Sequence, residues 1–271
     1  MFGAPPAAMV AFTMRLPRTI VIGTVVLAAL ALSAHSAHGQ LSGYAAQRDR
    51  WSFELTPYLW AAGMSGDIEV KNRTANVDPS FGDLFKDLDF GVMGAAEVRY
   101  DRWGFLLDGL YMKLSKDADT RGRLFSSVEA ILKMGMVEGY FMYRPVWLDV
   151  FTLDVMAGAR AWIIDTELDF KGGVLPGADV SHSTSFADPL IGFRARYYLS
   201  DKFSLSLAGD VGGFHVSSNV TWQAFGGFEW HFAEHWTALA GYRALGLDIE
   251  KRQIKIDAVF HGPVLGISYR F

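Results

Sequence analysis

Apolar and polar residues alternate with a period of two along most of this 271-residue chain. The final ten residues, GPVLGISYRF, place five mostly apolar residues on one parity: Pro263, Leu265, Ile267, Tyr269 and Phe271. Strict alternation predicts a β-strand whose two faces meet different surroundings. The apolar parity runs to the last residue, which suggests a strand that lies against hydrocarbon along its whole length.

Nine further segments show the same alternation, which makes ten in all. They cover 51–62, 88–100, 103–115, 128–144, 151–169, 186–199, 203–216, 219–232, 236–249 and 256–271. Very short connections, such as those at 101–102 and 200–202, alternate with longer ones at 63–87, 116–127 and 170–185. Short turns at one end and long loops at the other are typical of outer-membrane barrels. The predicted fold class is therefore all-β, a transmembrane antiparallel up-and-down β-barrel of about ten strands with both termini on the short-turn, periplasmic side.

The charged parity of these segments is expected to face the barrel lumen. Thirteen residues form this predicted lumen charge network: Glu54, Glu97, Arg99, Asp108, Glu138, Asp154, Arg160, Arg194, Arg196, Asp210, Glu229, Arg243 and Arg270. A soluble β-sandwich is the alternative, and it would bury the apolar parity between sheets and expose the charged one. A closed barrel is favoured because it satisfies every backbone hydrogen bond in lipid, which an open sheet cannot do.

Aromatic residues gather beside the short turns. The predicted girdle at the membrane interface consists of Trp51, Trp103, Trp147, Tyr197, Trp230, Trp236, Tyr269 and Phe271. Interfacial belts of this kind place amphipathic rings at the level of the lipid headgroups.

The N-terminus has the features of a cleavable secretory signal. Arg15 and Arg18 precede a largely apolar run of 13 residues at 20–32, which is followed by SAHSAHGQ. A membrane-spanning helix would need about 20 residues, so a signal peptide is favoured over an anchor. We expect residues 1–39 to be removed, with cleavage after Gly39 or Ser36 and Met14 as a candidate true start. Residues 40–271 would then form the barrel domain.

Composition excludes several other functions. The net charge of −4 is too small to indicate nucleic-acid binding, and the absence of cysteine rules out disulfides and thiolate metal sites. No histidine forms a close ligand pair on one face, so no metal and no cofactor are expected.

The segment LGISYRF, at 265–271, resembles the C-terminal signature that the insertion machinery of bacterial outer-membrane barrels is thought to read. The mature chain resembles the small OmpA-like and opacity-protein-like barrels, many of them uncharacterised. The stretches WSFELTPYLW, FGDLFKDLDFGVMGAAEVRYDRWGFLLDGLY and GFRARYYLSDKFSLSLAGDVGGF are similar to one such group. The resemblance implies an outer-membrane location, contact with lipid and with the assembly machinery, and eight strands as the alternative count.

Seven acids nearly balance six arginines in the predicted lumen. We therefore expect a polar, largely filled lumen and a structural or surface-interacting role, with the loops at 63–87 and 170–185 as contact surfaces for an unknown partner. A narrow porin-like channel for small solutes is the alternative.

A catalytic role is not expected. His215, Ser217 and Glu229 resemble the His-x-Ser pair and Glu of lipid A deacylase barrels, but Glu229 has the opposite parity and lies near the other end of its strand. Omptin-like proteases use acid pairs and a His–Asp couple, and Asp83, Asp87, Asp89 and Asp248 have no convincing histidine partner here. The segment 80–88 could form one amphipathic helical turn, but an ordinary loop is favoured.

Overall fold

The computed structural model describes residues 50–70, 73–78, 80–119, 125–172, 178–251 and 254–271. The predicted signal peptide at 1–39 and the first residues of the barrel domain at 40–49 lie outside the described residues. Within the described part of the chain, no helix has the length and apolarity needed to span a membrane.

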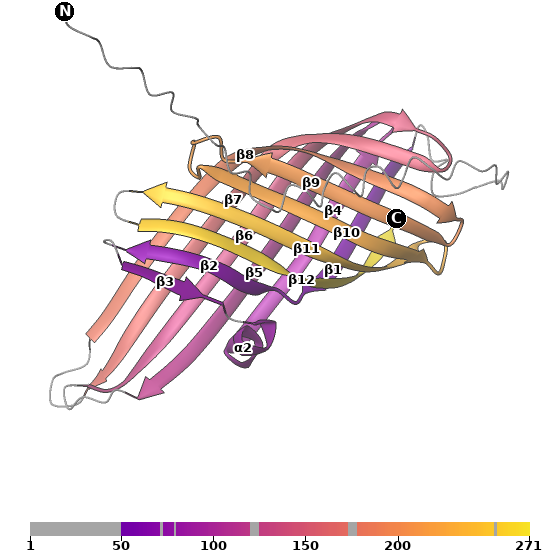
Figure 1. The fold of residues 1–271 in the computed structure, drawn as a ribbon. Helices are drawn as coiled ribbons and strands as arrows, with labels where there is room; N and C mark the ends of the chain where they lie inside the picture. The colour runs from indigo at the N-terminus through magenta and orange to yellow at the C-terminus, as the bar shows by residue number, and fades with distance from the viewer. Residues whose placement is uncertain (1–49, 71–72, 79, 120–124, 173–177, 252–253) are drawn as a thin grey trace, which may run out of the picture. The chain divides into compact units, whose positions relative to one another are not determined.

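The described residues form strands joined mostly by short turns, with one short helix (Figure 1). The strands are β1 (Trp51–Trp60), β2 (Gly63–Val70), β3 (Arg73–Val77), β4 (Leu88–Tyr100), β5 (Trp103–Asp119), β6 (Phe125–Trp147), β7 (Phe151–Gly172), β8 (Ala178–Ser200), β9 (Phe203–Gly212), β10 (Val220–His231), β11 (Trp236–Lys251) and β12 (Ile254–Arg270). The helix is α2 (Phe81–Lys86).

Ten of these strands close into a barrel. Each strand from β4 to β12 pairs with the next antiparallel, β4 also pairs with β1, and β1 pairs with β12, with Glu54 opposite Arg270 and Tyr58 opposite Gly266. The described residues therefore confirm the predicted up-and-down barrel and its count of ten. The alternative count of eight is wrong.

The predicted long loop at 63–87 is wrong. It contains a hairpin, β2 and β3, and β2 continues from β1 along the outer part of β12, with Gly63 opposite His261. It also contains α2, where a loop had been favoured. Ser80 caps this helix reciprocally with Asp83, and such a capping box supplies partners for backbone N–H groups that the first turn leaves unpaired.

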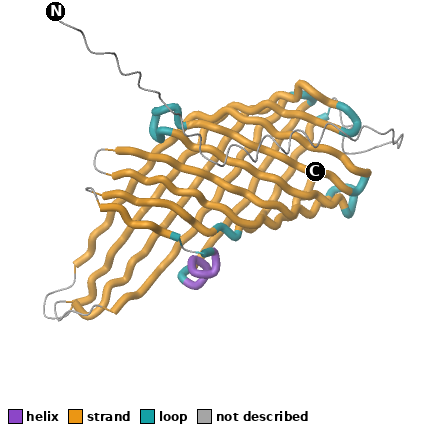
Figure 2. The backbone as a smooth tube through the Cα atoms, in the orientation of Figure 1, coloured by secondary structure: helices purple, strands orange, loops and turns teal. Residues whose placement is uncertain are grey.

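The predicted loop at 170–185 is also mostly strand, because β7 runs to Gly172 and β8 begins at Ala178. β6, β7 and β8 contain 23, 22 and 23 residues, whereas β9 has 10 and β10 has 12. Figure 2 shows the longer strands running past the ends of β9 and β10. About 9–11 residues suffice to cross a bilayer, so a tall wall of sheet (β5–β8) extends well beyond the length needed for crossing.

The outer and inner faces of the barrel differ as the alternation predicts. Large apolar side chains lie exposed on the outside, among them Phe141 at 72%, Phe193 at 42% and Leu205 at 40%. Ionic side chains lie buried on the inside, including Arg160 at 0% and Glu138 at 1%. Exposed apolar side chains around a closed barrel form a surface suited to hydrocarbon rather than water.

The expected polar lumen is found in only part of the barrel. Farther from the short turns, the inward side chains form an apolar layer of buried and half-buried residues. Its buried members are Trp60, Leu110, Met136, Trp162, Leu245 and Val264, packed against Tyr58, Ala62, Met93, Met112, Met134, Phe186, Phe225 and Phe260. The ion pairs that the described residues form around Arg160 and Asp154 lie between this layer and the short turns.

Candidate functional site: the barrel lumen

Arg160 is the centre of a mid-barrel ion cluster. It lies on β7 with no exposed surface, and its guanidinium donates to both Glu138 on β6 and Asp210 on β9. A third hydrogen bond, of 2.7 Å, goes to the Thr221 hydroxyl. Tyr140 also donates to Asp210 at 3.1 Å. The guanidinium thus links four strands across the lumen, and each buried carboxylate in this cluster has a cationic partner, as burial of charge requires.

Arg243 extends the mid-barrel cluster from β11. Its guanidinium lies 3.2 Å from Glu138 and 3.5 Å from Asp108, and it donates to the Tyr58 hydroxyl at 3.0 Å. The Tyr58 hydroxyl in turn donates to Asp108 at 2.8 Å. The Arg243 guanidinium also lies 4.9 Å from the centre of the Trp60 ring. Arg243 therefore joins the ionic part of the lumen to the apolar layer.

A second group of ion pairs, the turn-end cluster, surrounds Asp154. Its carboxylate receives hydrogen bonds from Arg99 at 3.0 Å, Arg144 at 2.8 and 3.0 Å, and Arg194 at 3.0 Å. Glu97 accepts two more from Arg194, at 2.7 and 3.1 Å. Two parallel hydrogen bonds from one guanidinium to one carboxylate fix the geometry of both side chains in addition to pairing their charges.

Two further pairs lie beside the turn-end cluster. Arg196 and Glu229 are 2.8 Å apart, and Arg270 and Glu54 are also 2.8 Å apart. Within the part of the chain that the structure describes, eleven ion pairs thus involve all thirteen residues of the predicted lumen charge network, together with Arg144. The structure brings the predicted set together inside one barrel.

Several lumen residues were missed by the sequence analysis. Arg144 on β6 and Asp188 on β8 are buried and inward-facing. Asp188 accepts hydrogen bonds from the backbone N–H groups of Ser217 and Ser218, at 3.0 and 2.8 Å, and so holds the loop between β9 and β10. Both residues share the parity of charged neighbours on their own strands, so parity could have found them.

The residues of the predicted girdle are exposed or half-buried, with one exception. Trp51, Trp103, Trp230, Trp236 and Phe271 are exposed, while Tyr197 and Tyr269 are half-buried. Trp147 was wrongly assigned to the girdle, because it is only 8% exposed and lies under the Arg144 guanidinium, 5.1 Å from its carbon. A register irregularity between Tyr143 and Val146 accounts for the change of face.

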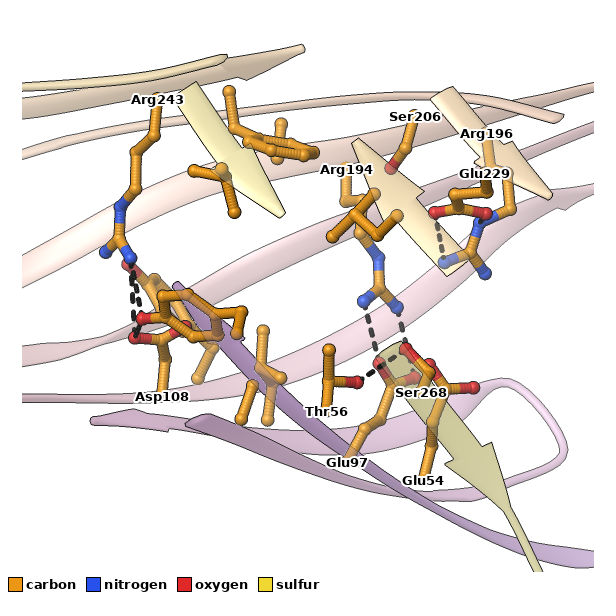
Figure 3. A pocket seen from close by; sticks show the side chains of 18 of the residues that line it. Glu54, Thr56, Glu97, Asp108, Arg194, Arg196, Ser206, Glu229, Arg243 and Ser268 are labelled. Carbon is orange, nitrogen blue, oxygen red and sulfur yellow. Dashed lines mark hydrogen bonds and ion pairs between the residues drawn. The ribbon is translucent and has the colours of Figure 1, made fainter. Parts of the chain in front are cut away.

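A cavity of about 180 Å³ lies within the lumen (Figure 3). Its lining combines charged residues with small hydroxyl side chains, among them Glu54, Arg194, Arg196, Thr56, Ser206 and Ser268. Tyr58, Phe225 and Val264, which belong to the apolar layer, also line it. The cavity is therefore bounded by ion pairs on some sides and by the apolar layer on another.

The residues considered for catalysis do not assemble. β9 ends at Gly212, so His215 and Ser217 lie in the loop that follows, and Ser217 donates to Asp188 and to the Ala187 carbonyl. Glu229 instead faces the lumen, paired with Arg196. No group of three or more His, Asp or Glu residues that could hold a metal ion occurs among the described residues.

One serine–histidine contact does occur in the lumen. The Ser204 hydroxyl lies 3.0 Å from His231 Nε2 and donates to Glu229 at 2.8 Å, while His231 Nδ1 lies 2.8 Å from the Thr237 hydroxyl. Because Ser204 is 0% exposed, a substrate cannot reach its hydroxyl in this structure. The contact ties β9, β10 and β11 together near their short turns.

No protein-family model matches the chain, and no curated protein matches it. Solved structures do. The outer membrane protease OmpT from Escherichia coli aligns with a TM-score of 0.53 at 9% identity, over 82% of this chain and 97% of that one. This chain has the fold of an outer-membrane β-barrel.

Other solved outer-membrane barrels align less closely. Neisserial surface protein A gives a TM-score of 0.33 at 12% identity, over 82% of this chain and 97% of that one. Ail from Yersinia pestis, in complex with a heparin analogue, gives 0.33 at 13% identity, over 82% and 98%. At identities this low a likeness to solved structures concerns the fold alone, and the OmpA-like and opacity-like grouping stays a prediction from the sequence.

Proposed function

We propose that this protein is an outer-membrane barrel with an occluded lumen, whose role is structural or surface-interacting rather than catalytic. The observation that carries the proposal is that two different groups of side chains fill the lumen, one beyond the other along the barrel. The ion clusters link opposite walls near the short turns, and the apolar layer fills the barrel beyond them. Hydrated ions are not expected to pass through an apolar constriction at low energetic cost.

The exported, membrane-embedded location is part of this proposal. It is supported by the exposed apolar outer face and by the aromatic side chains beside the short turns. At the C-terminus, Phe271 is 63% exposed and its backbone N–H donates to the Phe53 carbonyl at 2.9 Å. The last residue thus continues the closing pairing between β1 and β12, which suits a terminal strand that assembly machinery would recognise.

The tall wall of β5–β8 is proposed as the surface that contacts a partner. Because about half of β6, β7 and β8 exceeds the length needed to cross a bilayer, these strands can display a paired sheet outside the membrane. Paired strands hold such a surface more rigidly than loops would, so binding would cost less ordering entropy.

We expect purified, refolded protein to show no steady conductance in a planar bilayer. The two groups of side chains leave no continuous hydrated path for ions. The measurement is single-channel current at moderate voltage, with insertion verified independently by the heat-modifiable gel mobility of protein recovered from the same lipid.

A steady open state in the correctly inserted protein would contradict this proposal and favour the narrow channel. The cavity of about 180 Å³ is the feature that such a channel would use.

A further inference from the structure

The apolar layer contains two buried indole groups with unfilled hydrogen-bonding capacity. Trp60 and Trp162 are each 3% exposed, and neither indole N–H has a hydrogen-bond partner among the described residues. Leaving a buried donor unpaired costs about 1–3 kcal/mol. Unsatisfied donors in a native interior call for an explanation, and a bound acceptor is one.

The hydrogen-bonded pairing of the barrel strands is interrupted beside this layer. Pairing between β1 and β4 ends at Pro57 and Gly94, and beyond that point β2 pairs with β3 rather than with β4. The backbone N–H of Trp60 donates to the Met93 sulfur at 3.3 Å instead of to a strand carbonyl. We call this break the seam, bounded by β1–β3 on one side and by the outer part of β4, 88–93, on the other.

The seam lies at a depth where hydrocarbon is expected. Gly94 is six residues from Tyr100 at the short-turn end of β4, which corresponds to a rise of about 15 Å for a strand tilted about 40°. The apolar band of such barrels is about 25 Å tall. Beside the seam, Phe90 and Val92 are 57% and 56% exposed on the outer face.

The layer behind the seam is able to repack. Met93, Met112, Met134 and Met136 belong to it, and methionine side chains adapt readily to guests of varied shape. The cavity of about 180 Å³ adjoins the layer at Tyr58, Phe225 and Val264, so side chains displaced from the layer have room on that side. Arg243, whose guanidinium lies 4.9 Å from the centre of the Trp60 ring, is already engaged with Asp108 and Glu138, so this described cation is not left unpaired for a ligand ion.

We propose that the apolar layer binds the acyl chain of an uncharged ester, which enters from surrounding hydrocarbon through the seam. The ester oxygen accepts a hydrogen bond from the indole N–H of Trp60 or Trp162. The entry route rests on the proposed membrane location. Binding itself can be tested in detergent, so a failure of binding is distinguishable from a failure of the proposed non-conducting role.

The probe for this site is the methyl ester of a 16-carbon fatty acid carrying a diazirine in its chain. After illumination with purified protein in detergent, labelled residues are located by peptide mass spectrometry. We expect saturable labelling at Met93 and Met136, and non-saturable labelling at the outward-facing Phe141. Excess unlabelled methyl ester should remove the saturable part.

Substituting Trp60→Phe or Trp162→Phe keeps the ring and removes the donor. In at least one of these variants, the concentration of unlabelled methyl ester that halves the saturable labelling should rise about three- to tenfold, as expected for loss of one hydrogen bond. Competition by an alkane of equal length should not change in either variant. Labelling confined to outward positions would overturn the proposal, and so would equal competition by the ester in wild type and both variants.

Discussion

Replacing Arg160 with alanine should destabilise the barrel by about 3–5 kcal/mol, the range for breaking a buried ion pair. The guanidinium is fully buried and serves Glu138, Asp210 and Thr221 together. Its removal leaves two buried carboxylates, Glu138 and Asp210, with fewer hydrogen-bond partners. Equilibrium unfolding in denaturant, followed by the heat-modifiable mobility of the protein in lipid, measures the loss.

The matched control is Arg50→Ala, because Arg50 is exposed and lies just before β1. The same chemical change there should alter stability by no more than about 0.5 kcal/mol. A loss below about 1 kcal/mol for Arg160→Ala would mean that the cluster is hydrated rather than buried.

Leu207→Arg should destabilise the inserted barrel by about 2–4 kcal/mol, the cost of a cation on the lipid face near the bilayer midplane. Leu207 is exposed on the outer face of β9, four residues from Phe203 at the short-turn end. Folding into vesicles over a denaturant series gives the free energy directly.

The depth control for this substitution is Leu199→Arg. Leu199 is 53% exposed and lies at the turn-side end of β8, where the cost near an interface falls to about 0–1 kcal/mol. Equal costs at the two positions would contradict a bilayer around the barrel.

For strands with regular alternation, such as β8, the sequence was sufficient to predict the ionic face, because a period of two is read directly from residues such as Arg194 and Arg196. Parity does not give height along the barrel axis. Trp60 and Met136 have inward parity, but they are separated by 76 positions in the chain. Only the register of the strands shows that they meet in one apolar layer.

Two errors have specific physical causes. The irregular pairing near Tyr143 moves Trp147 to the inner face, and a shift of one residue reverses every side chain that follows. The hairpin of β2 and β3 was predicted as a loop although β2 alternates, with Met64, Ile68 and Val70 on one parity. Its strands have only 8 and 5 residues, which are short beside the predicted barrel strands, and length is the feature that led to a loop being predicted.

The most direct test of the whole account is the environment of two outward-facing positions, Phe193 and Leu205. The chain has no cysteine, so a single cysteine at either position can carry a nitroxide label in protein reconstituted into bilayers. We predict that oxygen, which concentrates in hydrocarbon, relaxes both labels strongly and that a water-soluble nickel complex does not. Strong relaxation by the nickel complex, with little effect of oxygen, would contradict the assignment of this face to lipid.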